Sequence, residues 1–479
     1  MKSCYIEIYI IFQLLFVFDV LIHPSSTQNG EYPENELGFM NDANNVAASN
    51  LVSVNVVYRH GARSPKFANF PNDPNNMNFS FIWPNGEKQL SENGMQMQYA
   101  LGAYFRERYG SFLSNMYKRD EIYVRSTDLD RALMSAQCNL AGLYPPAGKQ
   151  KWNGSLTSWQ PIPVHTVGLD DEELLRFPLR SNCPLYDKLL LDIRSSKTFI
   201  SHIENHKNFL KNISDLAGFN ETADDVVLLS NARKLYSTIQ CNLAENLIIP
   251  SWIDFNVITK LKEFAGFDYL SRFGDIGEEY QRIAMAKLNG GILLKKIISN
   301  LQDSVEGTNS LKFIQYSAHD TTLIPLLSAL NISNNFPAPF ASCLLFELYK
   351  DVSQNKTAYY IRTYYKNTTT GLFPMQALGC QNDCNFNEFI KRAKLIMPES
   401  NDINVICKIH ENKQAAMQFI EGNIFLFFIL IAILIAIFAI IVYYAKKRGS
   451  FMNQNEISMS SLQKMDYQPL NNVGYTENF

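Results

Sequence analysis

Apolar residues change their spacing from one region of the chain to the next. Short β-branched runs at Leu51–Tyr58, 121–124 and 310–318 predict buried strands, and each is followed by apolar positions at helical spacing. Farther on, the segments 342–350 and 357–367 alternate like the two strands of an antiparallel hairpin. Strands that alternate with helices predict an α/β fold with a central, mostly parallel sheet flanked by helices.

The helical segments differ in regularity. The helix after the first strand has Ser91 as an N-cap residue and Gly110 at its C-terminal end. Residues 151–300 favour helices, are less regular and contain no detectable repeat. We therefore expect a smaller helical domain at 151–300, inserted between two parts of an α/β domain at 51–150 and 301–410.

Two apolar segments near the chain ends lie outside this pattern. Residues 1–27 combine Lys2, an apolar stretch and small residues, which is typical of a signal peptide. Residues 424–442 are 19 consecutive apolar residues without a charge, which predicts a transmembrane helix at 423–444 rather than a core helix. A polar leader at 28–50 and a juxtamembrane linker at 411–422 complete the domain organisation.

Basic residues set the expected orientation of that helix. Lys446, Lys447 and Arg448 follow it directly, which places the tail 445–479 in the cytosol. We expect a single-pass type I membrane protein of the lysosome or plasma membrane, with its body in the lumen or outside the cell. The tail contains YQPL at Tyr467–Leu470, which is similar to signals that bind clathrin adaptors, although a merely solvated tail explains such a short pattern equally well.

Composition agrees with a folded body outside the cytosol. The chain of 479 residues is 46% hydrophobic and 19% charged, and its net charge of -3 gives no basic footprint for nucleic acid. Glycosylation sequons occur only in the body. They lie at Asn78, Asn153, Asn212, Asn220, Asn331, Asn355 and Asn367.

The cysteines are also confined to the body once Cys4 is removed with the signal peptide. The seven that remain allow up to three disulfides in an oxidising compartment, with one thiol left over. The close pair Cys380 and Cys384 could bind a metal in a cytosolic protein, and outside the cytosol it favours a small local disulfide.

Charged residues follow three predicted strands at the point where each strand ends. Arg59 and His60 follow the first strand, Arg125 the second, and His319 with Asp320 the third. Because ligands of such sheets bind beyond the carboxyl ends of the strands, these side chains are expected to lie together. Taken singly, a His–Asp pair or a helix cap by Thr127 or Asp128 would explain each motif without catalysis.

The combined residues predict phosphate chemistry. The planar forks of Arg59, Arg63 and Arg125 match phosphate oxygens, and their charges would repel a metal cation. The same charges disfavour the cationic form of His60, whose neutral imidazole is a nucleophile for phosphorus. Asp320 is then the acid that protonates the leaving oxygen, so the reaction should favour acidic pH.

The motifs RHGARSP and SAHDTTL, with VRSTDLDRALMSA and PIPVHTV between them, resemble the histidine acid phosphatases of the prostatic and lysosomal branch. The resemblance covers about Leu51 to Cys407. It implies an α/β domain with a smaller helical domain, no metal or cofactor, and often a homodimer. It also implies a His60 nucleophile, an Asp320 proton donor, and phosphate binding by Arg59, Arg63, Arg125 and His319.

The resemblance further implies a disulfide pattern and a substrate class. The bonds would join Cys183 to Cys407, Cys241 to Cys343, and Cys380 to Cys384, with Cys138 unpaired in a helix. The dipeptide His319–Asp320 separates the chain from the branch with HAE, which acts on inositol polyphosphates.

We therefore expect an acid phosphatase that hydrolyses small phosphate monoesters through a phosphohistidine intermediate. Two alternatives stay open, a selective lysophosphatidic acid or phytate phosphatase on the same site, and a catalytically silent binding or adhesion protein. The helical middle should shape the substrate entrance. Trp252 there either lines that entrance or is a buried structural residue.

Overall fold

The computed structural model describes most of the body and one apolar helix. The described residues are 50–156, 158–176, 183–219, 224–353, 356–367, 371–381, 383–407 and 431–444. Several sequence predictions concern residues outside these ranges. They are the signal peptide 1–27, the leader 28–49, the sequons at Asn220 and Asn355, the linker 411–422, the start of the apolar span and the tail with Tyr467–Leu470.

The described strands form one mixed sheet with the order β2-β3-β1-β4-β5-β6, and β7 pairs with β5. Strand β1 pairs in parallel with β3, as does β2, whereas every other pairing is antiparallel. The strand bounds are β1 Leu51–Arg59, β2 Ile122–Ser126, β3 Phe313–Ala318, β4 Cys343–Ser353, β5 Lys356–Lys366, β6 Phe373–Met375 and β7 Cys384–Asn385. The mostly parallel sheet was therefore a wrong expectation, because the predicted hairpin β4–β5 joins the same sheet beside β1.

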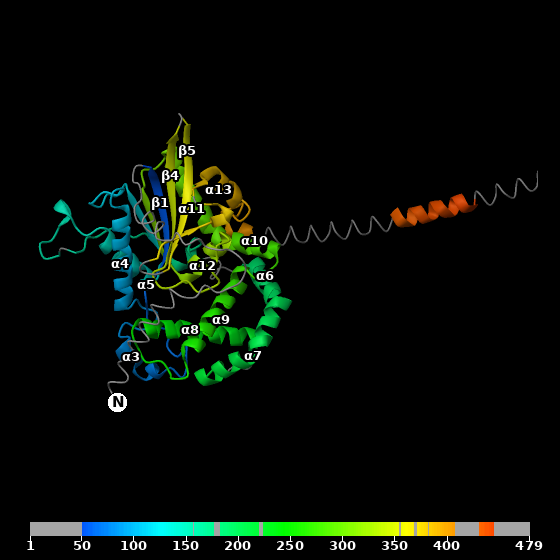
Figure 1. Ribbon diagram of the computed structural model, residues 1–479, viewed down its shortest axis with the longest axis horizontal. Coiled ribbons are helices and arrows are strands. Elements are labelled where there is room, and N and C mark those ends of the chain that lie inside the picture. The colour runs from blue at the N-terminus through cyan, green and yellow to red at the C-terminus, as the bar shows by residue number, and fades with distance from the viewer. Residues whose placement is uncertain are drawn as a thin grey trace, which may run out of the picture.

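Helices cover both faces of this sheet (Figure 1). Helices α4 and α5 pack on one face with residues of β1, β2 and β4, and α11 and α12 pack on the other. The helices are α3 Phe79–Ile82, α4 Glu92–Tyr109, α5 Asp130–Leu143, α6 Pro184–Arg194, α7 Lys197–Ala217, α8 Asp225–Ala244, α9 Phe255–Phe273, α10 Glu279–Leu288, α11 Gly290–Glu306, α12 Asp320–Ala329 and α13 Phe386–Ala393. Short 3-10 turns lie at η1 Pro74–Asn78, η2 Gly148–Gln150, η3 Leu169–Asp171 and η4 Ala377–Gly379.

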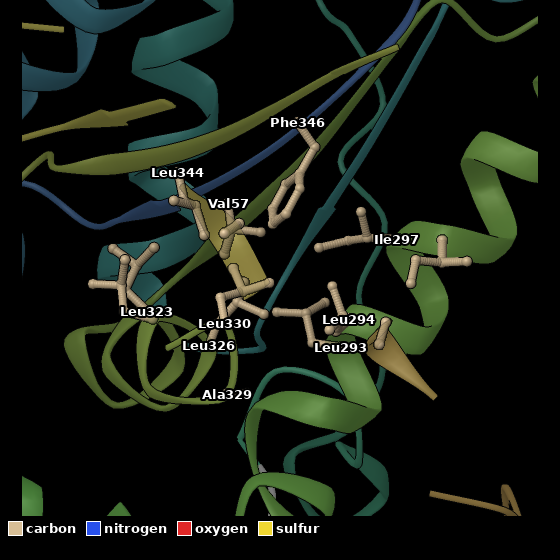
Figure 2. Packing of buried hydrophobic residues seen from close by; sticks show 14 of the residues in the cluster. Val57, Leu293, Leu294, Ile297, Leu323, Leu326, Ala329, Leu330, Leu344 and Phe346 are labelled. Carbon is tan, nitrogen blue, oxygen red and sulfur yellow. The ribbon is translucent and has the colours of Figure 1, made fainter. Parts of the chain in front are cut away.

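The larger core lies between the sheet and the α11–α12 layer. Figure 2 shows Val57 and Phe346 of the sheet facing Ile297 of α11, with Leu323 of α12 beside them. These side chains are fully buried, as expected for strands covered on both faces. This packing fixes the start of α12 against the ends of β1 and β3.

Helices α7, α8 and α9 form a separate layer with its own hydrophobic core. Phe70, from the segment between β1 and α4, joins that core and packs edge-on against Trp252 at 6.2 Å. Trp252 is therefore part of the packing of this layer. Because α11 packs on the sheet, residues 290–300 of the expected helical insert lie with the α/β layer.

The predicted N-cap is present at α4, whereas the caps considered for α5 are absent. The Ser91 hydroxyl accepts the Gly94 amide at 3.1 Å, and α4 ends at Gly110, as predicted. Helix α5 follows Leu129 and has no side-chain cap, so neither Thr127 nor Asp128 acts as its cap. The polar residues of this turn are available for other contacts.

Two of the three expected disulfides are present. Cys183 is joined to Cys407, and Cys380 to Cys384. Cys241 and Cys343 are separate buried thiols, so the third expected bond is not formed. The two side chains have different surroundings, since Cys343 packs in the core under α4 and α5, whereas the Cys241 sulfur of α8 accepts from the Arg63 guanidinium at 3.5 Å.

Residues 431–444 are helical and expose their apolar side chains. Among the described residues, no helix reaches the length and apolarity needed to cross a membrane. The first part of the expected span 423–444 lies outside the described residues.

Candidate active site

The parallel pairing of β1 and β3 brings two of the sequence motifs together. Arg59 lies opposite Ala318 in the register, and the His60 amide donates to the Ala318 carbonyl at 3.0 Å. The rings of His60 and His319 are consequently neighbours, with centroids 5.4 Å apart. Asp320 begins α12 directly after His319.

A close backbone contact fixes the loop that carries His60. A Cβ atom at Gly61 would lie 2.1 Å from the Gly94 carbonyl oxygen, so the loop and the first turn of α4 approach as only glycines permit. The Gly61 amide donates to the Ser135 hydroxyl of α5 at 3.2 Å. The loop is thus held between α4 and α5.

His60 is buried and neutral, with a defined tautomer. Its Nδ1 lies 2.8 Å from the Gly61 carbonyl oxygen, which can only accept, so Nδ1 donates and Nε2 keeps its lone pair. Burial, followed by the charges of Arg131 and Arg59, holds the pKa of His60 well below its usual range. The imidazole therefore presents an unprotonated Nε2 with its lone pair available.

Asp320 is held in its ionised form by its neighbours. Its Oδ2 lies 3.1 Å from Arg59 Nη2, and its Oδ1 accepts the Thr321 amide at 2.8 Å. Burial alone would raise the pKa of Asp320, but Arg59 and Arg63 outweigh burial and the net direction is downward. Any negative charge that offsets these arginines would make this carboxylate easier to protonate.

The structure adds Arg131, which the sequence argument missed, to this site. It lies in the first turn of α5, and burial and the charge of Arg63 lower its pKa to about 10. Its charge is the largest electrostatic influence on both His60 and His319. The sequence did contain a signal for Arg131. A cation in the first turn of a helix is unfavourable beside the positive end of the helix dipole, and a bound anion is one way to offset that cost.

Arg125 has a different role from the expected one. Strand β2 directs it to the same face as Tyr123, where its Nη2 lies 2.9 Å from Glu172 Oε1. The Glu172 side chain is fully buried and also accepts the amides of Leu174 and Leu175. Arg125 therefore anchors the segment around η3 instead of facing His60.

Arg63 and His319 complete the site. The Arg63 guanidinium donates to the Ser64 carbonyl at 2.9 Å and to the Ser237 hydroxyl of α8 at 3.4 Å. His319 Nε2 lies 2.8 Å from the Thr127 hydroxyl, and burial and Arg131 lower the pKa of His319. The helical layer and the β2–α5 turn thereby both contribute to the site.

The cationic cluster of Arg59, Arg63 and Arg131 carries three positive charges against the single carboxylate of Asp320. This balance suits a dianionic group such as a phosphate monoester. In the part of the chain that the structure describes, no group of three His, Cys, Asp or Glu side chains is arranged to hold a metal ion.

Solved structures with this fold include phytases. The phytase from Citrobacter braakii matches with a TM-score of 0.54 at 16% identity, covering 73% of this chain and 98% of that chain. The Hafnia alvei phytase in complex with myo-inositol hexakis sulphate gives 0.54 at 15% identity, covering 76% and 99%. At such identity the likeness shows the fold alone.

Curated relatives are closer in sequence. Prostatic acid phosphatase of Rattus norvegicus is 38% identical over 371 residues, covering 77% of this chain and 92% of the relative. Lysosomal acid phosphatase of Xenopus laevis is 39% identical over 338 residues, covering 70% and 74%. The family described as "Histidine phosphatase superfamily (branch 2)" matches residues 50–366. The chain therefore belongs to branch 2 of the histidine phosphatase superfamily.

Proposed function

We propose that the protein is an acid phosphatase that hydrolyses phosphate monoesters through a phosphohistidine at His60. One observation carries this proposal. The Gly61 carbonyl fixes the proton of His60 on Nδ1, and burial together with the surrounding arginines keeps the ring neutral, so Nε2 is free to attack phosphorus. The names of the relatives, acid phosphatases of the prostatic and lysosomal types, support the same reaction.

In the first step the phosphate binds to the cationic cluster, with His319 beside it. Nε2 of His60 then attacks phosphorus, the bond to the leaving oxygen breaks, and Asp320 gives that oxygen its proton. In the second step Asp320 takes a proton from water as the water attacks the phosphohistidine. Inorganic phosphate leaves, and both side chains return to their starting states.

The charges explain why an acidic medium is needed. Arg59 holds Asp320 ionised in the free site. A bound phosphate competes for Arg59 and adds negative charge, which favours protonation of Asp320. Low pH supplies that proton, and the depressed pKa of His60 keeps the nucleophile neutral at the same time.

We further infer that this body is anchored by the apolar residues 424–442 in the lysosomal or plasma membrane and faces the lumen or cell exterior. The sequons at Asn78, Asn153, Asn212 and Asn331 are exposed, which is compatible with glycosylation. The two disulfides suit an oxidising compartment. A homodimer and binding of clathrin adaptors through 467–470 belong to the same proposal.

Hydrolysis of p-nitrophenyl phosphate by the full chain in detergent tests the proposed reaction. We expect turnover at about pH 4 to 6 and an acid-labile phosphoenzyme in quenched reactions. His60→Ala should abolish both and leave the circular dichroism spectrum unchanged. Folded wild-type protein without turnover in this range would contradict the proposal and favour a silent binding protein.

A further inference from the structure

A tyrosine of the helical layer contacts the general acid. Tyr269 of α9 donates its hydroxyl proton to Asp320 Oδ2 at 3.3 Å. Tyr269 is only 9% exposed, and burial raises its pKa, so the hydroxyl remains a donor across the acidic and neutral range. This contact plays no part in the reaction steps described above.

Oδ2 is the oxygen on which the contact matters. Oδ1 is occupied by the Thr321 amide at the start of α12, whereas Oδ2 receives Arg59 and Tyr269. Oδ2 is therefore the oxygen positioned to carry the catalytic proton. When Arg59 turns to a bound phosphate, the Tyr269 hydroxyl is the protein donor that stays with Oδ2.

The neighbouring residue holds Tyr269 in place. Asp268 is fully buried and forms ion pairs with Arg194 of α6, Arg233 of α8 and Arg272 of α9, at 2.8, 2.6 and 2.8 Å. A buried charge with three partners from three helices strongly restricts the rotation of α9. The Tyr269 ring also lies parallel to Phe273, with an interplanar angle of 5°.

We propose that Tyr269 is a positioning residue for the proposed phosphatase reaction, whose hydroxyl keeps Asp320 Oδ2 directed at the leaving oxygen and stabilises the carboxylate after proton transfer. This inference rests on the proposed function of Asp320. Tyr269 exchanges no proton with the substrate. The proton passes from Oδ2 to the leaving oxygen, and the Tyr269 hydrogen bond shortens as the carboxylate forms.

The effect on pH dependence follows from the groups around the pair. The charged or titratable groups that act on Asp320 or Tyr269 are Arg59, Arg63, Arg131, Arg233, His319, Cys241 and Asp268. A hydroxyl that donates to a carboxylate lowers the pKa of that carboxylate. Removal of the hydroxyl should therefore raise the pKa of Asp320 while the other charges stay in place.

Tyr269→Phe tests this directly, with Tyr144→Phe as the matched control. Tyr144 is likewise a buried tyrosine, and it lies in the core under α4 and α5, away from Asp320. The alkaline limb of kcat should move up by about 0.5 to 1 pH unit in Tyr269→Phe. Its kcat for an alkyl phosphate should fall about 3- to 10-fold, with little change for p-nitrophenyl phosphate and in KM. Tyr144→Phe should match the wild type in each measurement.

Calorimetry of inorganic phosphate binding gives a second readout that needs no turnover. Binding measured in two buffers of different ionisation enthalpy reports the protons taken up, and Asp320→Asn identifies the share due to Asp320. In Tyr269→Phe, the pH of greatest uptake should rise by the same amount as the kinetic limb.

The outcomes separate the two proposals. Unshifted kinetic and calorimetric profiles in Tyr269→Phe would overturn the positioning role while leaving the phosphatase assignment intact. A shifted uptake profile in a protein that hydrolyses no phosphate monoester would support the Tyr269–Asp320 contact and defeat the proposed function. Equal losses for both leaving groups, without a pH shift, would indicate a merely structural tyrosine.

Discussion

At the scale of single residues, Arg125 of β2 and Arg131 of α5 are close in the sequence but have neighbours of different charge. Arg131 faces the other cations of the site, and Arg125 is neutralised by Glu172. Of the two, Arg125 forms an ion pair with a buried carboxylate, so Arg131 is the better candidate for binding a substrate anion. This difference separates two arginines that the sequence places close together.

Arg131→Ala should weaken phosphate binding. Loss of charge-assisted hydrogen bonds should raise the Ki of inorganic phosphate about 10- to 100-fold. Arg131 is also the strongest electrostatic influence on His60. Its removal should raise the pKa of His60 and so move the acidic limb of kcat/KM to higher pH. Both effects can be read from pH profiles with p-nitrophenyl phosphate.

Arg125→Ala is the contrasting variant. It leaves the buried Glu172 carboxylate without its ion-pair partner, so we expect a loss of stability of about 3 to 5 kcal/mol in denaturant unfolding. The Ki of phosphate in the folded fraction should change little. If Arg125→Ala weakened phosphate binding as much as Arg131→Ala, the division of roles between the two arginines would be contradicted.

Asp320→Asn tests the acid itself. An alkoxide leaving group needs a proton and a nitrophenolate scarcely does, so kcat for alkyl phosphates should fall about 10²- to 10⁴-fold and for p-nitrophenyl phosphate much less. The Asn side chain keeps the shape of the contact with Arg59. An equal loss for both leaving groups would count against the role of Asp320 as the acid.

At the scale of elements, the approach of the His60 loop to α4 sets the geometry of the site. A Cβ atom at Gly94 would lie 2.0 Å from the Ala62 carbonyl oxygen, and one at Gly61 would meet Gly94. Both contacts are backbone to backbone, so a substitution can be accommodated only by moving the loop away from the helix.

Gly94→Ala should therefore lower both stability and activity. We expect a loss of about 1 to 3 kcal/mol on unfolding from the steric conflict, with a fall in kcat because Nε2 of His60 is displaced. Gly154→Ala is the control, because no atom lies within 4 Å of the new methyl group and the sequon at Asn153 is retained. Normal kcat in Gly94→Ala would show that the loop tolerates the shift.

Local patterns were enough to predict the separate elements. The β1 run, the β4–β5 hairpin and the Ser91 cap depend on side chains close together in the sequence, and the structure has each of them. The convergence of His60 with His319 also followed, because it needs only that β1 and β3 are parallel neighbours.

Long-range geometry was not predictable in this way. The antiparallel half of the sheet forms because the β4–β5 hairpin pairs with β1, and the hairpin sequence does not specify that partner. Tyr269 reaches Asp320 through the rotation of α9, which the buried ion pairs of Asp268 set. Cys241 and Cys343 point into different surroundings, which no spacing in the sequence reveals.

At the scale of the whole molecule, the Cys183–Cys407 bond closes a loop with a sequence separation of 224 residues. The paired change to serine should lower the free energy of unfolding by about 2 to 5 kcal/mol, because it releases this long loop in the unfolded chain. kcat of the folded fraction should stay near that of the wild type, since neither cysteine touches the site. Unchanged stability in denaturant titrations would contradict this expectation.

The contact between the helical layer and the sheet layer also contains a partly buried carboxyl group. Asp275 follows the C-terminal end of α9 and accepts from the Ser328 hydroxyl of α12 at 2.5 Å. Burial raises the pKa of Asp275 from 3.8 to about 6. Its neutral form is therefore the one that the folded protein favours below about pH 6.

The free energy of unfolding of the whole molecule should therefore depend on pH through Asp275. Because its folded pKa is the higher one, its contribution is fully present below about pH 3.8 and is lost as pH rises through about 6, an effect of about 3 kcal/mol. Asp320 acts in the opposite sense, since its lowered pKa gives stability that is lost as pH falls.

Asp275→Asn isolates the contribution of Asp275, because asparagine cannot ionise. The variant should gain stability relative to the wild type between about pH 4 and 7 in denaturant unfolding. A stability difference that stays constant with pH would mean that Asp275 is not held neutral between the two layers.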